Sequence, residues 1–273
     1  RKARILRIIE QFSKGKANQD SLNEDALVIT DDFIAVLDGV TSKTCPAIDG
    51  KSGGRFAVEV ATDAIKVFSP DITARVVVDA LSAALRRAVA EKISVPAQAE
   101  HPSFVMIIYS KARREVWRVG DLCLSVDSVV HQNDLPVDQV TAATRALVIA
   151  AAVANGKTEA EIAQNDIGRA FIAPLLKEQH VFANRIDPYG YGVINGGTVP
   201  DVFIDVFDVR TAREIIFSSD GYPKLCATLE ESEAYLAAVL RDDPLLYRTH
   251  KATKGLGTGL VSFDDRTYVR FLS

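Results

Sequence analysis

Asn-Glu-Asp-Ala-Leu-Val-Ile-Thr-Asp-Asp-Phe-Ile-Ala-Val-Leu-Asp-Gly, residues 23–39, is the most informative stretch of this sequence. It holds two short apolar runs, residues 26–30 and 33–37, separated by Asp31 and Asp32. Two such runs on either side of a two-residue polar break predict a β-hairpin. Since both runs are apolar throughout, we expect the two strands to be buried.

The predicted hairpin brings acidic residues together at its open end. Counting outward from the turn places Asp25 opposite Asp38 and Glu24 opposite Gly39. Directly opposed residues have Cβ atoms roughly 5 Å apart, and like charges at such positions destabilise a sheet. At about 4 Å and an effective dielectric near 20, each pair costs on the order of 4 kcal/mol. Either one acid is protonated or a cation lies between them.

Other expected strand ends repeat this feature. Residues 215–217 are apolar and lead to Asp220, and Asp264 and Asp265 directly precede a final expected strand at 267–272. Oxygen ligands without nearby His or Cys suit Mg²⁺ or Mn²⁺. Carboxylates shared between two such ions, roughly 3.5–4 Å apart, generate hydroxide and stabilise in-line displacement at phosphorus. Acidic residues are also common at strand ends for ordinary solvation reasons, so spacing alone leaves both interpretations open.

The rest of the chain predicts helices in blocks between strands. Expected helices cover residues 56–68, 71–93, 139–179 and 230–240, and further strands cover residues 103–109, 115–119, 122–126, 129–130 and a second hairpin at 202–209 and 214–218. Helical blocks between hairpin-linked strands favour an α+β fold with helices on both faces of two stacked, mostly antiparallel sheets. This is a four-layer α-β-β-α sandwich, and without an internal repeat or composition shift we expect a single domain over residues 1–273.

Bulk composition excludes several classes of protein. The net charge is -4 with 48% hydrophobic and 25% charged residues, which is ordinary for a globular protein. Without a basic block, nucleic-acid binding is not predicted, and the longest apolar run, residues 142–154, is too short to span a membrane. Cys45, Cys123 and Cys226 lie far apart and form no disulfide framework, so we expect a cytoplasmic protein.

Five acid-bearing motifs follow one another along the chain: Asn23-Glu24-Asp25-Ala26, Val36-Leu37-Asp38-Gly39, Val119-Gly120-Asp121, Phe217-Ser218-Ser219-Asp220-Gly221 and Asp264-Asp265-Arg266-Thr267. In order and spacing they resemble the metal-dependent serine/threonine phosphatases of type 2C. The resemblance covers nearly the whole chain and implies a β-sandwich flanked by helices. It also implies hydrolysis of phosphoserine and phosphothreonine esters by direct attack of a metal-bridging water, without a phosphoenzyme.

The resemblance assigns catalytic roles to three aspartates. Asp38 would bridge two Mn²⁺ or Mg²⁺ ions, and Asp220 and Asp264 would complete one of the two metal sites.

Four more residues receive metal-binding roles in the same way. The carbonyl of Gly39 would bind the ion of the other metal site, and Glu24 would bind it through water. Asp25 would not bind an ion directly and would instead orient the residues that do. Asp121 matches a position that some members use for a third, weaker metal. The family's second acid for that third site is Lys224 here.

The sequence departs from the family in substrate-binding residues. Many members have a His after Asp-Gly, where this chain has Val40, and many have an Arg four residues before the motif's Glu, where this chain has Asp20. Basic residues in adjoining loops could hold the phosphate instead, and the candidates are Lys14, Lys16 and, above all, Lys43, Lys51 and Arg55. The expected partner is therefore a phosphorylated protein or a small phosphomonoester.

These departures leave three functions open. The first is a phosphatase of phosphoserine and phosphothreonine in proteins. The second is a phosphatase of a small phosphomonoester with the same mechanism. The third is a catalytically weak regulatory protein that retains the fold, although a scaffold has little reason to keep acids that repel one another.

Overall fold

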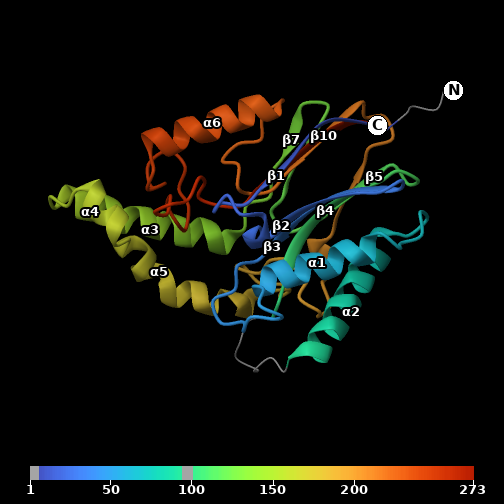
Figure 1. Cartoon of the computed structure of the whole chain (residues 1–273), viewed down its shortest axis with the longest axis horizontal. Helices are drawn as coiled ribbons and strands as arrows, with labels where there is room; N and C mark the ends of the chain where they lie inside the picture. The colour runs from blue at the N-terminus through green and yellow to red at the C-terminus, as the bar shows by residue number, and fades with distance from the viewer. Residues whose placement is uncertain (1–5, 94–100) are drawn as a thin grey trace.

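The computed structural model describes residues 6–93 and 101–273. In this part of the chain, two five-stranded sheets stack on each other and helices flank them (Figure 1). All pairings between neighbouring strands are antiparallel. The predicted α+β sandwich of four layers, α-β-β-α, is confirmed.

Each sheet combines strands from distant parts of the sequence. The first sheet has, in spatial order, β1 (Arg7–Lys14), β10 (Arg266–Leu272), β9 (Glu214–Ser218), β6 (Cys123–Val126) and β7 (Val129–His131). The second sheet has β2 (Asp25–Ile29), β3 (Phe33–Gly39), β4 (Phe104–Ser110), β5 (Glu115–Val119) and β8 (Asp205–Asp208).

Strand β3 shows why the chain forms a two-sided sheet. Ile34 and Val36 point into the core between the sheets, and Phe33, Ala35 and Leu37 point toward the helices on the other side. All five are at most 2% exposed. A strand covered on both faces has to be apolar at every position, which is why β3 shows no alternation.

The core between the sheets is built largely from large side chains of facing strands. The ring of Phe271 on β10 lies 5.2 Å from Tyr109 on β4 and 5.4 Å from Phe217 on β9, measured between centroids. Aromatic pairs at this distance contribute beyond their buried area. The contact between Phe271 and Tyr109 joins the two sheets, and the contact between Phe271 and Phe217 joins neighbouring strands of one sheet.

The outer helical layers cover opposite sheets. Helices α1 (Gly53–Ile65) and α2 (Ala74–Lys92) pack on the second sheet through buried residues such as Leu81. Helix α6 (Leu229–Asp242) packs on the first sheet through residues such as Leu236.

A separate helical excursion lies beside the sandwich. It contains α3 (Pro136–Ala154), α4 (Glu159–Gln164) and α5 (Ile167–Glu178). Among the described helices, α3 is the one long and apolar enough to span a membrane by length and composition, and 33% of its most apolar window is buried inside the fold. Arg145 of α3 is fully buried and pairs with Asp166 at 2.6 Å, which fixes α3 against the start of α5.

Short single-turn helices complete the described elements, namely Asp20–Leu22, Gln179–Phe182 and Asp201–Phe203.

Two sequence-based expectations about strands need correction. The hairpin expected over residues 202–209 and 214–218 is wrong, because β8 pairs with β5 while β9 lies between β10 and β6 in the other sheet. Strand β1 was not expected at all. Its basic, amphipathic sequence is that of an edge strand whose one neighbour is β10.

Candidate metal centre

The first hairpin delivers its acids as predicted. Strand β2 pairs with β3 so that Asp25 lies opposite Asp38, and the Gly39 N–H donates to the carbonyl of Glu24 at 3.0 Å. Asp25 is 2% exposed and Glu24 5%, so two acids are buried behind the end of the sheet. Asp38 is the member of this group that reaches open space.

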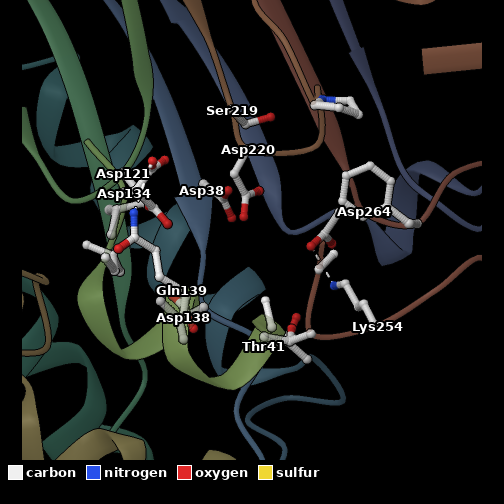
Figure 2. A pocket seen from close by; sticks show the side chains of 18 of the residues that line it. Asp38, Thr41, Asp121, Asp134, Asp138, Gln139, Ser219, Asp220, Lys254 and Asp264 are labelled. Carbon is white, nitrogen blue, oxygen red and sulfur yellow. Dashed lines mark hydrogen bonds and ion pairs between the residues drawn. The ribbon is translucent and has the colours of Figure 1, made fainter. Parts of the chain in front are cut away.

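A cavity of about 490 Å³ lies at this end of the two sheets. Its lining includes four of the predicted aspartates and Gly39. Asp38 ends β3, Asp121 follows β5, Asp220 follows β9 and Asp264 precedes β10. Two different sheets therefore contribute carboxyl groups to one space (Figure 2).

Asp38 and Asp220 face each other in this cavity. Figure 2 shows their carboxyl groups side by side. Burial raises the pKa of Asp38 well above its usual value, and the charges of Asp25 and Asp220 add to this. Asp220 opens onto the cavity, yet enclosure by protein, followed by the charge of Asp264, also raises its pKa. Neither carboxyl group forms an ion pair with a described basic residue, although the charge of Lys254 partly offsets that of its neighbours at Asp220.

Asp121 extends this uncompensated acidic region. Its pKa is raised well above the usual value, first by burial and then by the charges of Asp220 and Asp138. Asp138 comes from the first turn of α3, so the helical excursion adds a carboxyl group to the same wall.

Asp25 supports the centre from behind. Ser219 Oγ donates to Asp25 Oδ2 at 2.7 Å and accepts from the Thr267 N–H at 2.9 Å, so β2, β9 and β10 are linked next to Asp220. The other oxygen, Asp25 Oδ1, is buried and has no hydrogen-bond partner. Burial raises the pKa of Asp25 to about 8.

Glu24 is held by hydroxyl groups rather than facing the cavity directly. Thr41 Oγ1 donates to Oε2 and Ser52 Oγ to Oε1, both at 2.5 Å. A Cβ on Gly54 would lie 2.8 Å from Oε1, and one on Gly39 would lie 2.6 Å from the Gly54 carbonyl carbon. The two glycines are therefore needed for this close packing of the loop against β3.

Asp264 is balanced differently, by two lysines. Lys16 Nζ lies 3.0 Å from Oδ1 and Lys254 Nζ lies 2.5 Å from Oδ2. Burial alone would raise the pKa of Asp264, but Lys254 and Lys16 outweigh it and lower the pKa. Lys16 also reaches Asp265 at 3.2 Å. In Figure 2, the Asp264 carboxylate turns toward Lys254 rather than toward Asp38.

The residues present fit hard divalent cations. Their side chains offer oxygen ligands alone, and Asp38 with Asp220 forms a facing pair whose mutual repulsion a cation would relieve. Within the described residues, no three acidic, His or Cys side chains already surround one point. Both oxygens of Asp264 already pair with a lysine, so an ion held by Asp38, Asp220 and Asp264 together would share this carboxylate with the ammonium groups or replace one of them.

Comparison with known proteins identifies the family. A sequence model of protein phosphatase 2C matches residues 10–243. The chain belongs to this family. No curated protein sequence matches it.

Solved structures with a similar fold include bacterial members of the same class. One is the serine/threonine phosphatase Stp1 from Staphylococcus aureus, with TM-score 0.50 and 16% identity over 99% of this chain and 96% of that chain. Another is the catalytic domain of the serine/threonine protein phosphatase PstP in complex with two manganese ions, with TM-score 0.50 and 15% identity over 98% and 97% of the two chains. At these identities the similarity shows the fold.

Of the basic residues predicted to hold phosphate, Lys43, Lys51 and Arg55 differ from one another in their position relative to the cavity. Lys43 lines the cavity. Lys51 and Arg55 are not among its lining residues, and both pair with Glu59 on α1. Arg55 also donates to the Asn23 carbonyl at 2.7 Å, so it fixes the loop before β2.

Several cavity residues were not predicted from the family pattern. Lys254 comes from the loop before β10, and Arg169 comes from α5. His250 is the one histidine among the described lining residues, and burial lowers its pKa. The sequence contained one hint of the loop that carries Lys254. Segment 251–259 contains glycines and leads directly to Asp264, as expected for a loop beside the acidic motif.

Proposed function

We propose that this chain is a metal-dependent phosphatase that hydrolyses phosphoserine and phosphothreonine esters in proteins. The observation that supports this is the facing pair of Asp38 and Asp220 at the floor of the cavity. Two adjacent buried carboxyl groups without an ion pair to a described basic residue are costly to fold, and a cation-dependent activity explains why they are kept.

The proposed ligands are the predicted set. Asp38 would bridge two Mn²⁺ or Mg²⁺ ions, with Asp220, Asp264 and the Gly39 carbonyl as further ligands. Asp121 would offer a weaker third site. Such ions, when bound, activate water and neutralise negative charge at phosphorus.

The chain's own residues position this chemistry. Asp25, through Ser219, fixes the segment that carries Asp220, and Glu24 is held by Thr41 and Ser52 behind Gly39. These contacts lock the geometry from buried positions, which is what a preorganised site requires.

The side chains that line the cavity are poorly suited to covalent catalysis, which favours direct attack by water. Burial raises the pKa of the Cys123 thiol to about 11, so it stays protonated at neutral pH and is a weak nucleophile. The Ser219 hydroxyl is engaged by Asp25 and by Thr267. The ester is then cleaved with water supplying the new oxygen on phosphorus.

The test is release of phosphate from a phosphothreonine peptide with Mn²⁺, comparing the wild type with Asp38→Asn. We expect activity to be lost in Asp38→Asn and retained in Asp63→Asn, a matched change at an exposed acid on α1. Full activity in Asp38→Asn, or in protein treated with a chelator, would contradict the proposal.

A small phosphomonoester is the second candidate substrate. The observation in its favour is the cavity wall that α3 and α5 add through residues such as Ala142 and Leu176, which encloses the space above the acids. Higher turnover of small phosphorylated metabolites than of phosphopeptides would favour this alternative.

A catalytically weak regulatory role is the third candidate. Its support is Asp264, whose two oxygens are both engaged by lysines. Calorimetric titration that detects no binding at millimolar Mn²⁺ would favour it over both phosphatase candidates.

A further inference from the structure

The cavity has a basic side that the acidic centre does not explain. Cations from four separate segments line it: Lys43, Arg169, Lys224, Lys251 and Lys254. Lys254 is engaged by Asp264, and Lys224 lies over the Tyr235 ring at 5.5 Å. Arg169 and Lys251 form no ion pair with the residues that the structure describes.

Arg169 is fixed in place without being neutralised. Its backbone N–H donates to Asp166 Oδ1 at 2.7 Å in the first turn of α5, while Asp166 Oδ2 is taken by Arg145 at 2.6 Å. The Arg169 guanidinium donates to the carbonyl of Thr253 at 2.7 Å. A guanidinium has five N–H donors, so most of them remain for a ligand.

Three of the basic residues act on one region of the cavity, and Lys251 lines the same cavity from the loop before β10. Asp138 lies across from them on α3, and the charges of Lys43, Arg169 and Lys254 all act on its carboxyl group. Arg169 also lies close enough to Asp264 to feel its charge. The basic side and the acidic centre are therefore neighbours within one space of about 490 Å³.

We propose that Arg169, in a cavity that Lys251 also lines, forms an anion subsite for an acidic side chain near the phosphorylated residue of a substrate protein. The proposal rests on the proposed phosphatase function and names the substrate class for that site. An extended peptide advances about 3.3–3.6 Å per residue, so only residues close in sequence to the phosphorylated one stay near the cavity. A planar guanidinium matches a carboxylate in two parallel hydrogen bonds.

A pair of phosphothreonine peptides tests the subsite, one with Glu at the flanking positions and one with Gln. We expect the wild type to favour the Glu peptide in kcat/KM by roughly tenfold, a typical effect for one well-placed charge pair. Arg169→Gln should remove this preference, and Arg169→Glu should reverse it toward a peptide with Lys at the same positions. High salt should weaken the preference, because the subsite is open to solvent.

Lys177→Gln is the matched control, since it removes the same charge from an exposed position on the same helix outside the cavity lining. It should keep the wild-type preference. Equal turnover of the two peptides by the wild type, or the same loss in Lys177→Gln, would overturn the proposal.

Binding separates this proposal from the phosphatase proposal. Fluorescence anisotropy with labelled peptides and Asp38→Asn measures recognition without turnover. A preference for the Glu peptide in binding, with no hydrolysis by the wild type, would reject the phosphatase function and keep the anion subsite. Equal binding of the two peptides would reject the subsite whatever the activity.

Discussion

The two sides of the acidic centre balance their negative charge in different ways. Asp38 and Asp220 face each other without an ion pair to a described basic residue, and burial raises the pKa of both. The charge of Asp220 adds to the shift of Asp38, and that of Asp264 to the shift of Asp220. Asp264 has both oxygens on lysines, and its pKa is lowered. One side is costly to the folded protein until a cation arrives, whereas the other is already neutralised from within. The difference separates the acids that we propose to serve ion binding above all from an acid that also stabilises the fold.

We call Asp38 and Asp220 the uncompensated side, and Asp264 with its neighbour Asp265 and their lysines the compensated side. Removing an acid from the uncompensated side should affect activity most. Asp220→Asn takes one oxygen ligand from the facing pair, so we expect kcat/KM with Mn²⁺ to fall on the order of 10³-fold, about 4 kcal/mol. The melting temperature of metal-free protein should stay the same or rise, because a repulsive pair is relieved. Steady-state kinetics and thermal denaturation measure the two effects. A lower melting temperature without a loss of activity would remove the proposed contrast between the two sides.

Removing an acid from the compensated side should affect stability instead. Asp265 is 3% exposed and accepts from the backbone N–H groups of Lys16 at 2.8 Å and Glu24 at 3.1 Å. Asp265→Ala leaves these two buried backbone donors unpaired and removes one of the carboxylate partners of Lys16, which keeps its ion pair with Asp264. The free energy of unfolding should therefore fall by about 3 kcal/mol. Urea denaturation measures it.

The control for that experiment is Asp242→Ala, because Asp242 pairs with Arg241 where both are exposed. Exposed pairs contribute at most about 1 kcal/mol, so its effect should be small. Equal effects of the two substitutions would mean that the compensated side has no special structural role.

Metal addition should act through the uncompensated side. At Mn²⁺ one hundred times above its dissociation constant, binding to the folded state alone stabilises by about 2.7 kcal/mol. We expect this gain in thermal stability to disappear with a chelator and to be absent in Asp38→Asn. An equal gain in Asp38→Asn would place the ion elsewhere in the molecule.

The hairpin and its acids could be predicted because local sequence specifies them. The turn at Asp31 and Asp32 fixes the register, and the register alone puts Asp25 opposite Asp38. Strand β8 shows the limit of such reasoning. Its pairing with β5 depends on a contact between segments far apart in the chain, and no turn connects them.

The basic residues of the cavity could not be predicted from the sequence, because they too reach the site through contacts between segments far apart in the chain. Arg169 reaches the site because α5 packs on α3 through buried Arg145, and Lys254 because its loop passes Asp264. Neither follows from spacing to the acidic motifs. The role of the Gly39 carbonyl, a third ion at Asp121, the single-domain organisation and the cytoplasmic location stay predictions.

The smallest expected effect is a change in Mn²⁺ affinity when Lys254, which pairs with Asp264, is replaced. Lys254 occupies Asp264 Oδ2, so an ion that uses Asp264 has to compete with this ammonium group. Lys254→Met removes the competitor and keeps an apolar chain of similar length. We therefore expect Mn²⁺ to bind about tenfold more tightly, a change of about 1.4 kcal/mol. Isothermal titration calorimetry measures the affinity without depending on turnover.

Lys251→Met provides the comparison, because Lys251 lines the same cavity without an ion pair to the described residues. It also removes one positive charge from the cavity, so any general electrostatic gain in Mn²⁺ affinity appears in both variants. The excess in Lys254→Met then reports direct competition at Asp264. Should the two variants bind Mn²⁺ equally, Lys254 would not compete with the ion. The compensated side would then have to be regarded as purely structural, with Asp264 outside the metal centre.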